Sequence, residues 1–195
     1  FLAHCHRVTP AMFCLPRYLL CTDEPIKLVD STMLPVCTLK RAEKHKVAAG
    51  IAAFGKNHQG WHFGFKLHAS VDGKGRLCGL ALTPANAYDA QVLPVIINKK
   101  TKIAVGDSYY GASVMRRKIW EQYGTIIVAP PHYKQKKKLM TFWQHQLLRA
   151  RSKIEAVFDI LKQHLQLVSS FPRSPFGYLV HYVRILLGYQ IMVLA

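Results

Sequence analysis

Acidic side chains are scarce in this sequence. Its 195 residues contain 10 Asp and Glu against 27 Lys and Arg, which gives a formal net charge of +17. Such an excess of positive charge favours an anionic partner, either nucleic acid or an anionic membrane surface, and leaves a merely basic ribosomal-type protein as the alternative. Charge does not decide the fold, so the positions of the few carboxylates carry more information than their number.

Cysteine is also sparse and irregularly placed. The five cysteines are odd in number, and the cluster His4-Cys5-His6 is not followed by a second pair of ligands at zinc spacing. This pattern favours reduced thiols over a disulfide framework or a structural zinc site. A Gly-rich phosphate loop of the Walker type is missing as well, which argues against an ATP-dependent reaction.

Long apolar runs are almost absent, apart from one at the end of the sequence. The segment 178–195 is nearly all apolar, but it contains His181, Arg184 and Gln190 and has only 18 residues. A membrane-spanning helix needs about 20 predominantly apolar residues. We therefore expect a buried C-terminal helix and no membrane partner.

The remaining pattern predicts an α/β fold. Segment 26–33 is typical of a strand, and apolar residues alternate with polar ones over 63–71, as in a half-exposed strand. The sequence Asp-Gly-Lys-Gly at 72–75 predicts a hairpin turn into a partner strand over 77–82. Further strands are expected over 102–105 and 125–129, and helices over 90–98, 111–123 and 142–168. Three antiparallel strands followed by strand–helix units are the order of a ribonuclease H-like mixed sheet flanked by helices.

The domain organisation follows from where this pattern begins. Residues 1–25 show no clear period, and the sequence starts with Phe rather than Met. We interpret 1–25 as the end of a truncated upstream N-terminal region and 26–195 as one catalytic domain.

Three of the ten acids stand where a metal-dependent enzyme would place them. Asp30 follows the apolar run 26–29, Asp107 follows 103–106, and Glu155 lies in the long helix. In the predicted topology the two strands are neighbours, so Asp30 and Asp107 are expected to meet at one end of the sheet. Three carboxylates can hold two divalent ions, Mg²⁺ or Mn²⁺, against a phosphate.

The helical spacing favours Glu155 as the third acid. Arg151, Glu155 and Lys162 fall on one stripe of the helix, with the apolar stripe beside it. Asp159 is the nearest rival, although it lies further toward the solvent side. Arg151 and Lys162 are expected to contact phosphates next to the reacting bond.

The basic segments allow two interpretations each. The segment 40–66 contains several glycines and Trp61, so it is either a DNA-contacting loop whose Trp61 stacks on a base or a solvated loop anchored by that tryptophan. Lys136 and Lys137 belong to a lysine-rich loop that either contacts the DNA backbone or is simply solvated. Lys66 and His68 alternate with apolar residues, which would allow both to face the catalytic edge.

Four ordered motifs resemble bacterial insertion-sequence DDE transposases, most closely insertion-sequence family nine-eighty-two. They are Val29-Asp30-Ser31-Thr32, the segment 60–68 (Gly-Trp-His-Phe-Gly-Phe-Lys-Leu-His), the segment 82–89 (Leu-Thr-Pro-Ala-Asn-Ala-Tyr-Asp) and Gly106-Asp107-Ser108-Tyr109-Tyr110. The likeness covers residues 26–190. Two positions depart from the family pattern: Leu148 stands where a tyrosine is usual, and Tyr109 where a glycine is usual.

The resemblance implies a catalytic triad and a substrate. Asp30, Asp107 and Glu155 would bind two Mg²⁺ or Mn²⁺ ions, and Arg151, Lys162, Lys66, Trp61, Lys136 and Lys137 would bind DNA. The expected function is cleavage of transposon ends and strand transfer into target DNA by a homodimer in the cytoplasm, associated with the nucleoid. The alternatives are an inactive DNA-binding remnant and a metal-dependent nuclease of the same fold.

Overall fold

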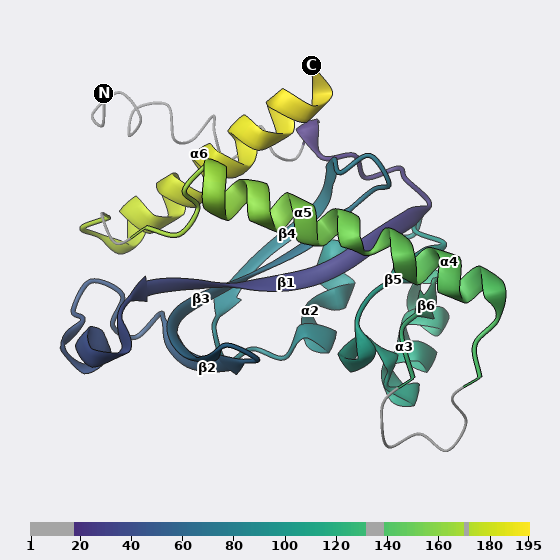
Figure 1. The fold of residues 1–195 in the computed structure, drawn as a ribbon, viewed down its shortest axis with the longest axis horizontal. Helices are drawn as coiled ribbons and strands as arrows, with labels where there is room; N and C mark the ends of the chain where they lie inside the picture. Colours follow the sequence, from purple (N-terminus) through teal and green to yellow (C-terminus); the bar gives the residue numbers. More distant parts are fainter. Residues whose placement is uncertain (1–17, 132–138, 170–171) are drawn as a thin grey trace.

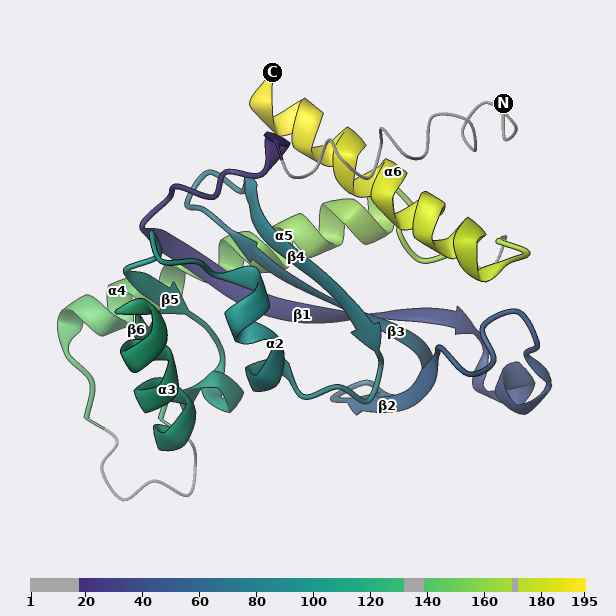
Figure 2. The same ribbon diagram turned by 180° about the vertical axis from the view of Figure 1, so that it is seen from behind.

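A mixed sheet with helices on both faces forms the centre of the molecule (Figures 1 and 2). The computed structural model describes residues 18–131, 139–169 and 172–195. Its strands are β1 (Ile26–Cys37), β2 (Ala53–Asn57), β3 (Gly60–Val71), β4 (Leu77–Pro84), β5 (Ile103–Val105) and β6 (Ile126–Val128). Its helices are η1 (Leu39–Lys44), α2 (Asp89–Ile96), η2 (Ser108–Gly111), α3 (Ser113–Tyr123), α4 (Phe142–Ala150), α5 (Ser152–Asp159), η3 (Ile160–His164) and α6 (Pro175–Leu194).

The antiparallel half of the sheet is built around β3. This strand pairs with β1 along one edge, and on its other edge with β2 in its first part and β4 in its second. The predicted three antiparallel strands are therefore confirmed as β1, β3 and β4. The sequence analysis missed β2, because its five residues contain one large apolar side chain, Phe54, and no alternation that marks a strand.

The parallel half extends the sheet beyond β1. β5 pairs with β1, and β6 pairs with β5, both in parallel, with α2 and α3 as the connecting helices. The last two residues of each of these short strands, Ala104, Val105, Ile127 and Val128, are buried, as in parallel strands covered by helices. α3 ends as predicted at Gly124, whose φ of 64° is left-handed and therefore suits a residue without a Cβ atom.

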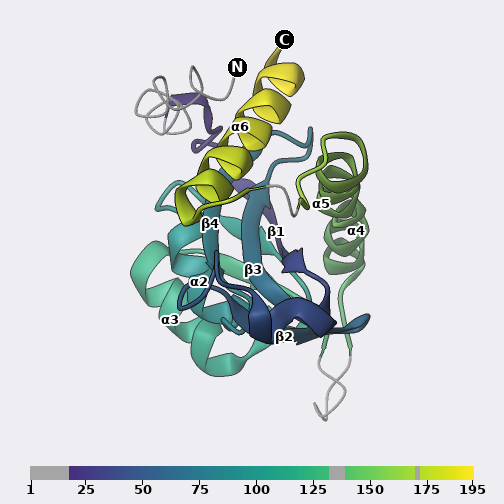
Figure 3. The same ribbon diagram turned by 90° about the vertical axis from the view of Figure 1, so that its left-hand side faces the viewer.

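Two apolar cores hold the helices against the sheet. One lies under α5 and α6 and includes alternate residues of β3: Phe63, Phe65, Leu67, Ala69 and Val71. The other lies under α2 and α3 on the opposite face. Figure 3 shows the sheet between these two helical layers. A side chain on the sheet can thus be assigned to a face by its position along the strand.

β1 is longer than the sequence analysis predicted. It continues to Cys37 because Met33, Leu34 and Val36 are all buried. Asp30 therefore lies in the middle of a 12-residue strand and not at its end, which corrects the predicted placement.

The predicted long helix is present as three successive segments. Thr141 begins α4 with a capping box, in which its hydroxyl accepts from the Gln144 amide and the Gln144 side chain accepts from the Thr141 amide. Arg151 joins α4 to α5 with helical backbone angles. Ile154, Val157 and Leu161 are buried against the sheet, so they fix which edge of the helix faces β1.

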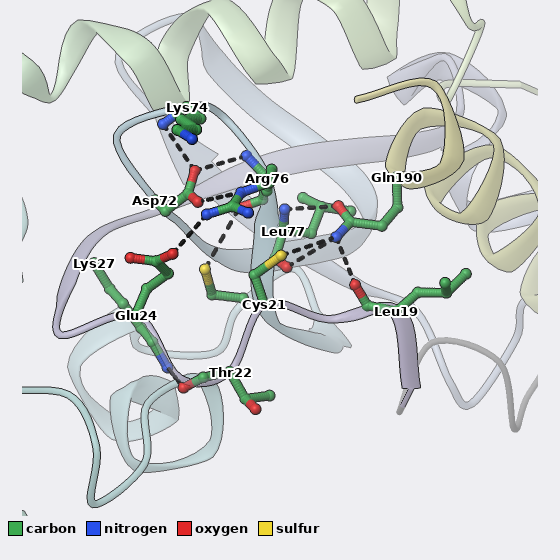
Figure 4. A network of polar contacts seen from close by, with 11 residues as sticks. Leu19, Cys21, Thr22, Glu24, Lys27, Asp72, Lys74, Arg76, Leu77 and Gln190 are labelled. Atoms are coloured by element: carbon green, nitrogen blue, oxygen red, sulfur yellow. Dashed lines mark hydrogen bonds and ion pairs between the residues drawn. The ribbon is translucent and has the colours of Figure 1, made fainter. Parts of the chain in front are cut away.

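A cluster of charged groups ties the turn after β3 to the segment before β1 (Figure 4). The Asp72 carboxylate accepts from the backbone amides of Lys74 and Arg76, at 2.8 and 2.9 Å, and from Arg76 Nε at 2.6 Å. The same guanidinium forms an ion pair with Glu24. These contacts fix the predicted hairpin turn at 72–75.

The C-terminal helix α6 is packed on the sheet. By length and composition it is the one helix in the described residues that could cross a membrane. However, Tyr178, Tyr182 and Tyr189 are buried in the core, and the buried Gln190 side chain accepts from the Leu77 amide at 2.7 Å (Figure 4). The expected buried C-terminal helix is confirmed.

Candidate active site

Asp30 and Asp107 are brought together by the parallel pairing of β1 and β5. The last paired residues are Leu28 and Val105, and each aspartate stands two positions beyond its strand's paired residue. Both carboxylates therefore occupy equivalent positions on neighbouring strands. Asp30 Oδ1 accepts from the Ser31 amide at 2.8 Å, which orients it.

Local packing sets the direction in which the chain leaves β5. Gly106 lies against the buried Tyr110 ring, and a Cβ atom at this position would come within 2.6 Å of Tyr110 Cδ2. Asp107 then begins the short helix η2, where its Oδ1 accepts from the Tyr109 amide at 3.0 Å. Tyr109 replaces the glycine of the related motif without strain: Gln166 alone among the described non-glycine residues has a positive φ, and the Tyr109 side chain is 70% exposed.

Arg151 links the first carboxylate to the third. Its Nη2 atom lies 3.1 Å from Asp30 Oδ2 and 3.3 Å from Glu155 Oε1. The pairing follows from the helix geometry, since residues 151 and 155 are one turn apart and α5 packs across β1. One guanidinium thus connects Glu155 to the strand that carries Asp30.

The ionised forms of Asp30 and Asp107 are energetically unfavourable in the folded protein. Burial raises the pKa of Asp30, and the nearby Arg151 charge only partly opposes this rise. Burial also raises the pKa of Asp107, and the negative charge of Asp30 raises it further. Two carboxylates held close together and away from water favour the binding of positive charge.

The carboxylates of Asp30, Asp107 and Glu155 are not gathered around a single point. Among the described residues, no group of three or more His, Cys, Asp or Glu side chains is close enough together to hold a metal ion. Glu155 reaches Asp30 only through Arg151, and its side chain is 56% exposed. The structure therefore brings Asp30 and Asp107 side by side and leaves Glu155 at the edge.

Comparison with known proteins decides the family. A family model described as a transposase DDE domain matches residues 21–175, most of the chain. The chain belongs to the transposase DDE domain family. No solved structure matches it significantly. Members of this family are transposition enzymes that act on DNA, and DDE domains generally use divalent metal ions.

The predicted DNA-contacting residues of this DDE domain lie in different places. Lys162 is seven residues beyond Glu155 on the helix, and none of the ion pairs within the described residues involves it. Trp61 is 55% exposed and lies at the start of β3, next to the β2–β3 turn. Lys136 and Lys137 lie outside the described residues.

Lys66 is placed in the interior rather than on a DNA-accessible surface. Its Nζ donates to the Ala87 carbonyl at 2.9 Å and to Asp89 Oδ1 at 3.1 Å, and its side chain is only 11% exposed. We therefore assign Lys66 to the stability of the DDE domain. No local sequence pattern reveals this contact, because Lys66 and Asp89 are 23 positions apart.

His68 belongs to the same internal cluster. Its side chain is fully buried, Nε2 lies 2.9 Å from the Thr83 hydroxyl, and Nδ1 lies 3.5 Å from Asp89 Oδ1. Burial lowers the pKa of His68 to about 4, although Asp89 acts in the opposite direction. Because His68 is neutral and on the α2 face of the sheet, it does not serve as a base for chemistry at Asp30.

The buried imidazole predicts a loss of stability in acid. Unfolded histidine binds a proton below pH 6.5, whereas folded His68 does so only near pH 4. Lowering the pH from 7.5 to 5 should therefore cost on the order of 2 kcal/mol of unfolding free energy through this group. Urea unfolding of the parent and His68→Gln at both pH values measures this loss; equal losses in the two proteins would contradict it.

Proposed function

We propose that this DDE domain cleaves DNA at transposon ends and joins the freed 3′-hydroxyl to target DNA. The observation that carries the proposal is the placement of Asp30 and Asp107 at equivalent positions on neighbouring strands, with Glu155 linked to Asp30 through Arg151. Membership of the transposase DDE domain family supports it.

The chemistry of the donor set fits Mg²⁺ or Mn²⁺, and we propose two ions. Asp30, Asp107 and Glu155 supply only oxygen donors, which hard divalent cations prefer. The raised pKa of both aspartates, caused mainly by burial, supports a role for compensating positive charge at these groups. When bound, the metal ions would activate the attacking water or hydroxyl and stabilise the leaving oxygen.

Residues of the chain hold the two aspartates in place and can contact the substrate. Asp30 is fixed by the Ser31 amide and Asp107 by the Tyr109 amide, so neither carboxylate has to be ordered during the reaction. Arg151 and Lys162 lie along one helix edge, where they can contact phosphates on either side of the reacting bond.

Two in-line displacements complete the proposed reaction. In the first, water forms a bond to phosphorus while the bond from phosphorus to the 3′-oxygen of the transposon end breaks; that oxygen takes up a proton from the water and becomes a free 3′-hydroxyl, and the flanking DNA keeps a 5′-phosphate. In the second, that 3′-hydroxyl attacks a target phosphate, and a target 3′-oxygen leaves with the proton. Neither step passes through a covalent bond between protein and DNA.

The finer assignment follows the same observations. We propose that the sheet is ribonuclease H-like, because antiparallel β1, β3 and β4 are followed by α2–β5–α3–β6 in parallel. We further propose that residues 26–195 form the catalytic domain of an insertion-sequence transposase similar to family nine-eighty-two. It would act as a homodimer on DNA, in the cytoplasm and associated with the nucleoid.

A strand-transfer assay tests the proposal. Pre-cleaved transposon ends, plasmid target and Mn²⁺ should give joined products with the parent chain and none with Asp107→Asn. Cutting without joining would contradict the transposase function and favour a nuclease. DNA binding without any metal-dependent nicking would instead favour a non-catalytic remnant.

A further inference from the structure

The C-terminal end of β1 lies away from β5 (Figure 1), and residues of that end line a groove. It is a cavity of about 490 Å³ between the end of β1, the start of η1 and the β2–β3 hairpin. Its lining includes Cys37, Thr38, Arg41, Trp61 and His62. This volume lies within the range of about 300–1,000 Å³ that is usual for small-molecule sites. We refer to it as the Trp61 groove.

The walls of the Trp61 groove combine an aromatic face with positive charge. Trp61 is 55% exposed, and Lys56 Nζ lies 5.9 Å from the centre of its ring. The segment 38–60 carries five Lys and Arg and one acid, Glu43. All five cations are exposed: Lys40, Arg41, Lys44, Lys46 and Lys56. Exposed aromatic rings among cations are typical of surfaces that bind single-stranded nucleic acid.

The groove and the carboxylates lie on the same face of the sheet. Trp61 precedes the core residue Phe63 by two positions on β3, so both side chains point to the α5 side. Asp30 is paired with Ala69, which also belongs to that core. Asp30 and Trp61 thus belong to the side of the sheet that α5 covers, so DNA bound on that side of the molecule can reach both without passing to the α2 side.

The distance between Asp30 and the Trp61 groove follows from the number of β1 residues that separate them. Pro35 and Cys37 line the groove and lie five and seven residues beyond Asp30, which at about 3.3 Å per residue places the groove roughly 17–23 Å away. On the long helix, Lys162 lies about 10 Å beyond Glu155, toward the groove. Its charge also lowers the pKa of His62 in the groove, where burial has the larger effect.

We propose that the Trp61 groove binds an unpaired nucleotide of the DNA strand that is held at the carboxylates. The base stacks on Trp61, and Arg41, Lys56 and Lys162 contact the adjoining phosphates. At about 3.4 Å per nucleotide of duplex, the bound nucleotide lies about five to seven positions from the reacting phosphate. The proposal rests on the proposed action on DNA and adds a strand preference that the catalytic residues do not provide.

Binding of a single-stranded oligonucleotide tests the proposal without metal chemistry. Fluorescence anisotropy with labelled dT15 in EDTA should show that Trp61→Ala weakens binding about tenfold and Trp61→Phe much less, because stacking is lost only in the first. Binding of a 15-base-pair duplex should change little. Trp120→Ala is the matched control, since Trp120 is 57% exposed on α3, on the opposite layer.

A second variant addresses the charged wall and guards against misfolding. Arg41→Gln should reduce the slope of log affinity against log salt by about 1 while leaving the urea midpoint unchanged. Equal weakening of dT15 by Trp61→Ala and Trp120→Ala, or equal weakening of dT15 and duplex by Trp61→Ala, would overturn the proposal. Because dT15 binding is measured in EDTA, it is scored separately from the metal-dependent nicking that tests the carboxylates.

Discussion

Replacement of Glu155 by Gln is expected to reduce metal-dependent nicking of DNA by about a thousandfold or more. Removing a metal-binding carboxylate weakens transition-state stabilisation by several kcal/mol, and each 1.36 kcal/mol is about tenfold in rate. Glu155 is the acid that Arg151 connects to Asp30, at 3.3 Å. The measurement is the rate at which supercoiled plasmid is nicked in Mn²⁺.

Asp159 provides the matched control for this experiment. It lies one helical turn beyond Glu155, is exposed like Glu155, and forms none of the ion pairs within the described residues. Asp159→Asn should therefore nick at close to the parent rate. If Asp159→Asn lost activity and Glu155→Gln retained it, the third carboxylate would be Asp159.

Asp107→Asn is expected to abolish nicking and to stabilise the metal-free protein. The loss of activity follows from the loss of a metal-binding oxygen. The gain in stability follows because burial and the charge of Asp30 raise the pKa of Asp107, so that the ionised carboxylate is unfavourable in the folded state. A neutral amide of the same shape removes this cost, which is about 1 kcal/mol for a typical strained active-site position.

The raised pKa of Asp107 also determines how the stability of the folded protein changes with pH. Between the ordinary pKa of aspartate and the raised folded value, the unfolded chain binds fewer protons than the folded one, so stability falls as pH rises through this window. Thermal unfolding of Asp107→Asn without metal should show a higher midpoint at pH 7 and a smaller fall with rising pH. Asp23→Asn removes an exposed pair with Lys100 that lowers the pKa of Asp23, so it should change neither nicking nor the fall in stability within this window. A lower midpoint for Asp107→Asn at pH 7 would contradict the assignment.

Much of the fold was predictable because it depends on local patterns. Alternating apolar residues located β3, and the glycine-rich sequence at 72–75 located the turn and hence the partner strand β4. β2 was not predictable, since a five-residue strand with one large apolar side chain gives no periodic signal. The full length of β1 was also missed: the predicted strand stopped at Met33, and Pro35, a residue that is unusual inside strands, follows two positions later.

The candidate site was predictable only in part, for a different physical reason. The neighbouring positions of Asp30 and Asp107 follow from strand order, which the sequence indicated. The contact of Arg151 with Asp30 joins residues 121 positions apart and depends on how α5 packs across β1. Likewise, the Lys66–Asp89 ion pair forms where α2 meets β3. Lys66, which the sequence analysis predicted to contact DNA, therefore lies in an internal ion pair.

The position of one bound Mn²⁺ ion tests the central claim most directly. A crystal structure of the protein with Mn²⁺, located by its anomalous scattering, should show an ion about 2 Å from carboxylate oxygens of Asp30, Asp107 and Glu155. The Arg151–Glu155 contact should lengthen as Glu155 turns toward the ion. An ion bound away from Asp30 and Asp107, or none at saturating Mn²⁺, would contradict the account.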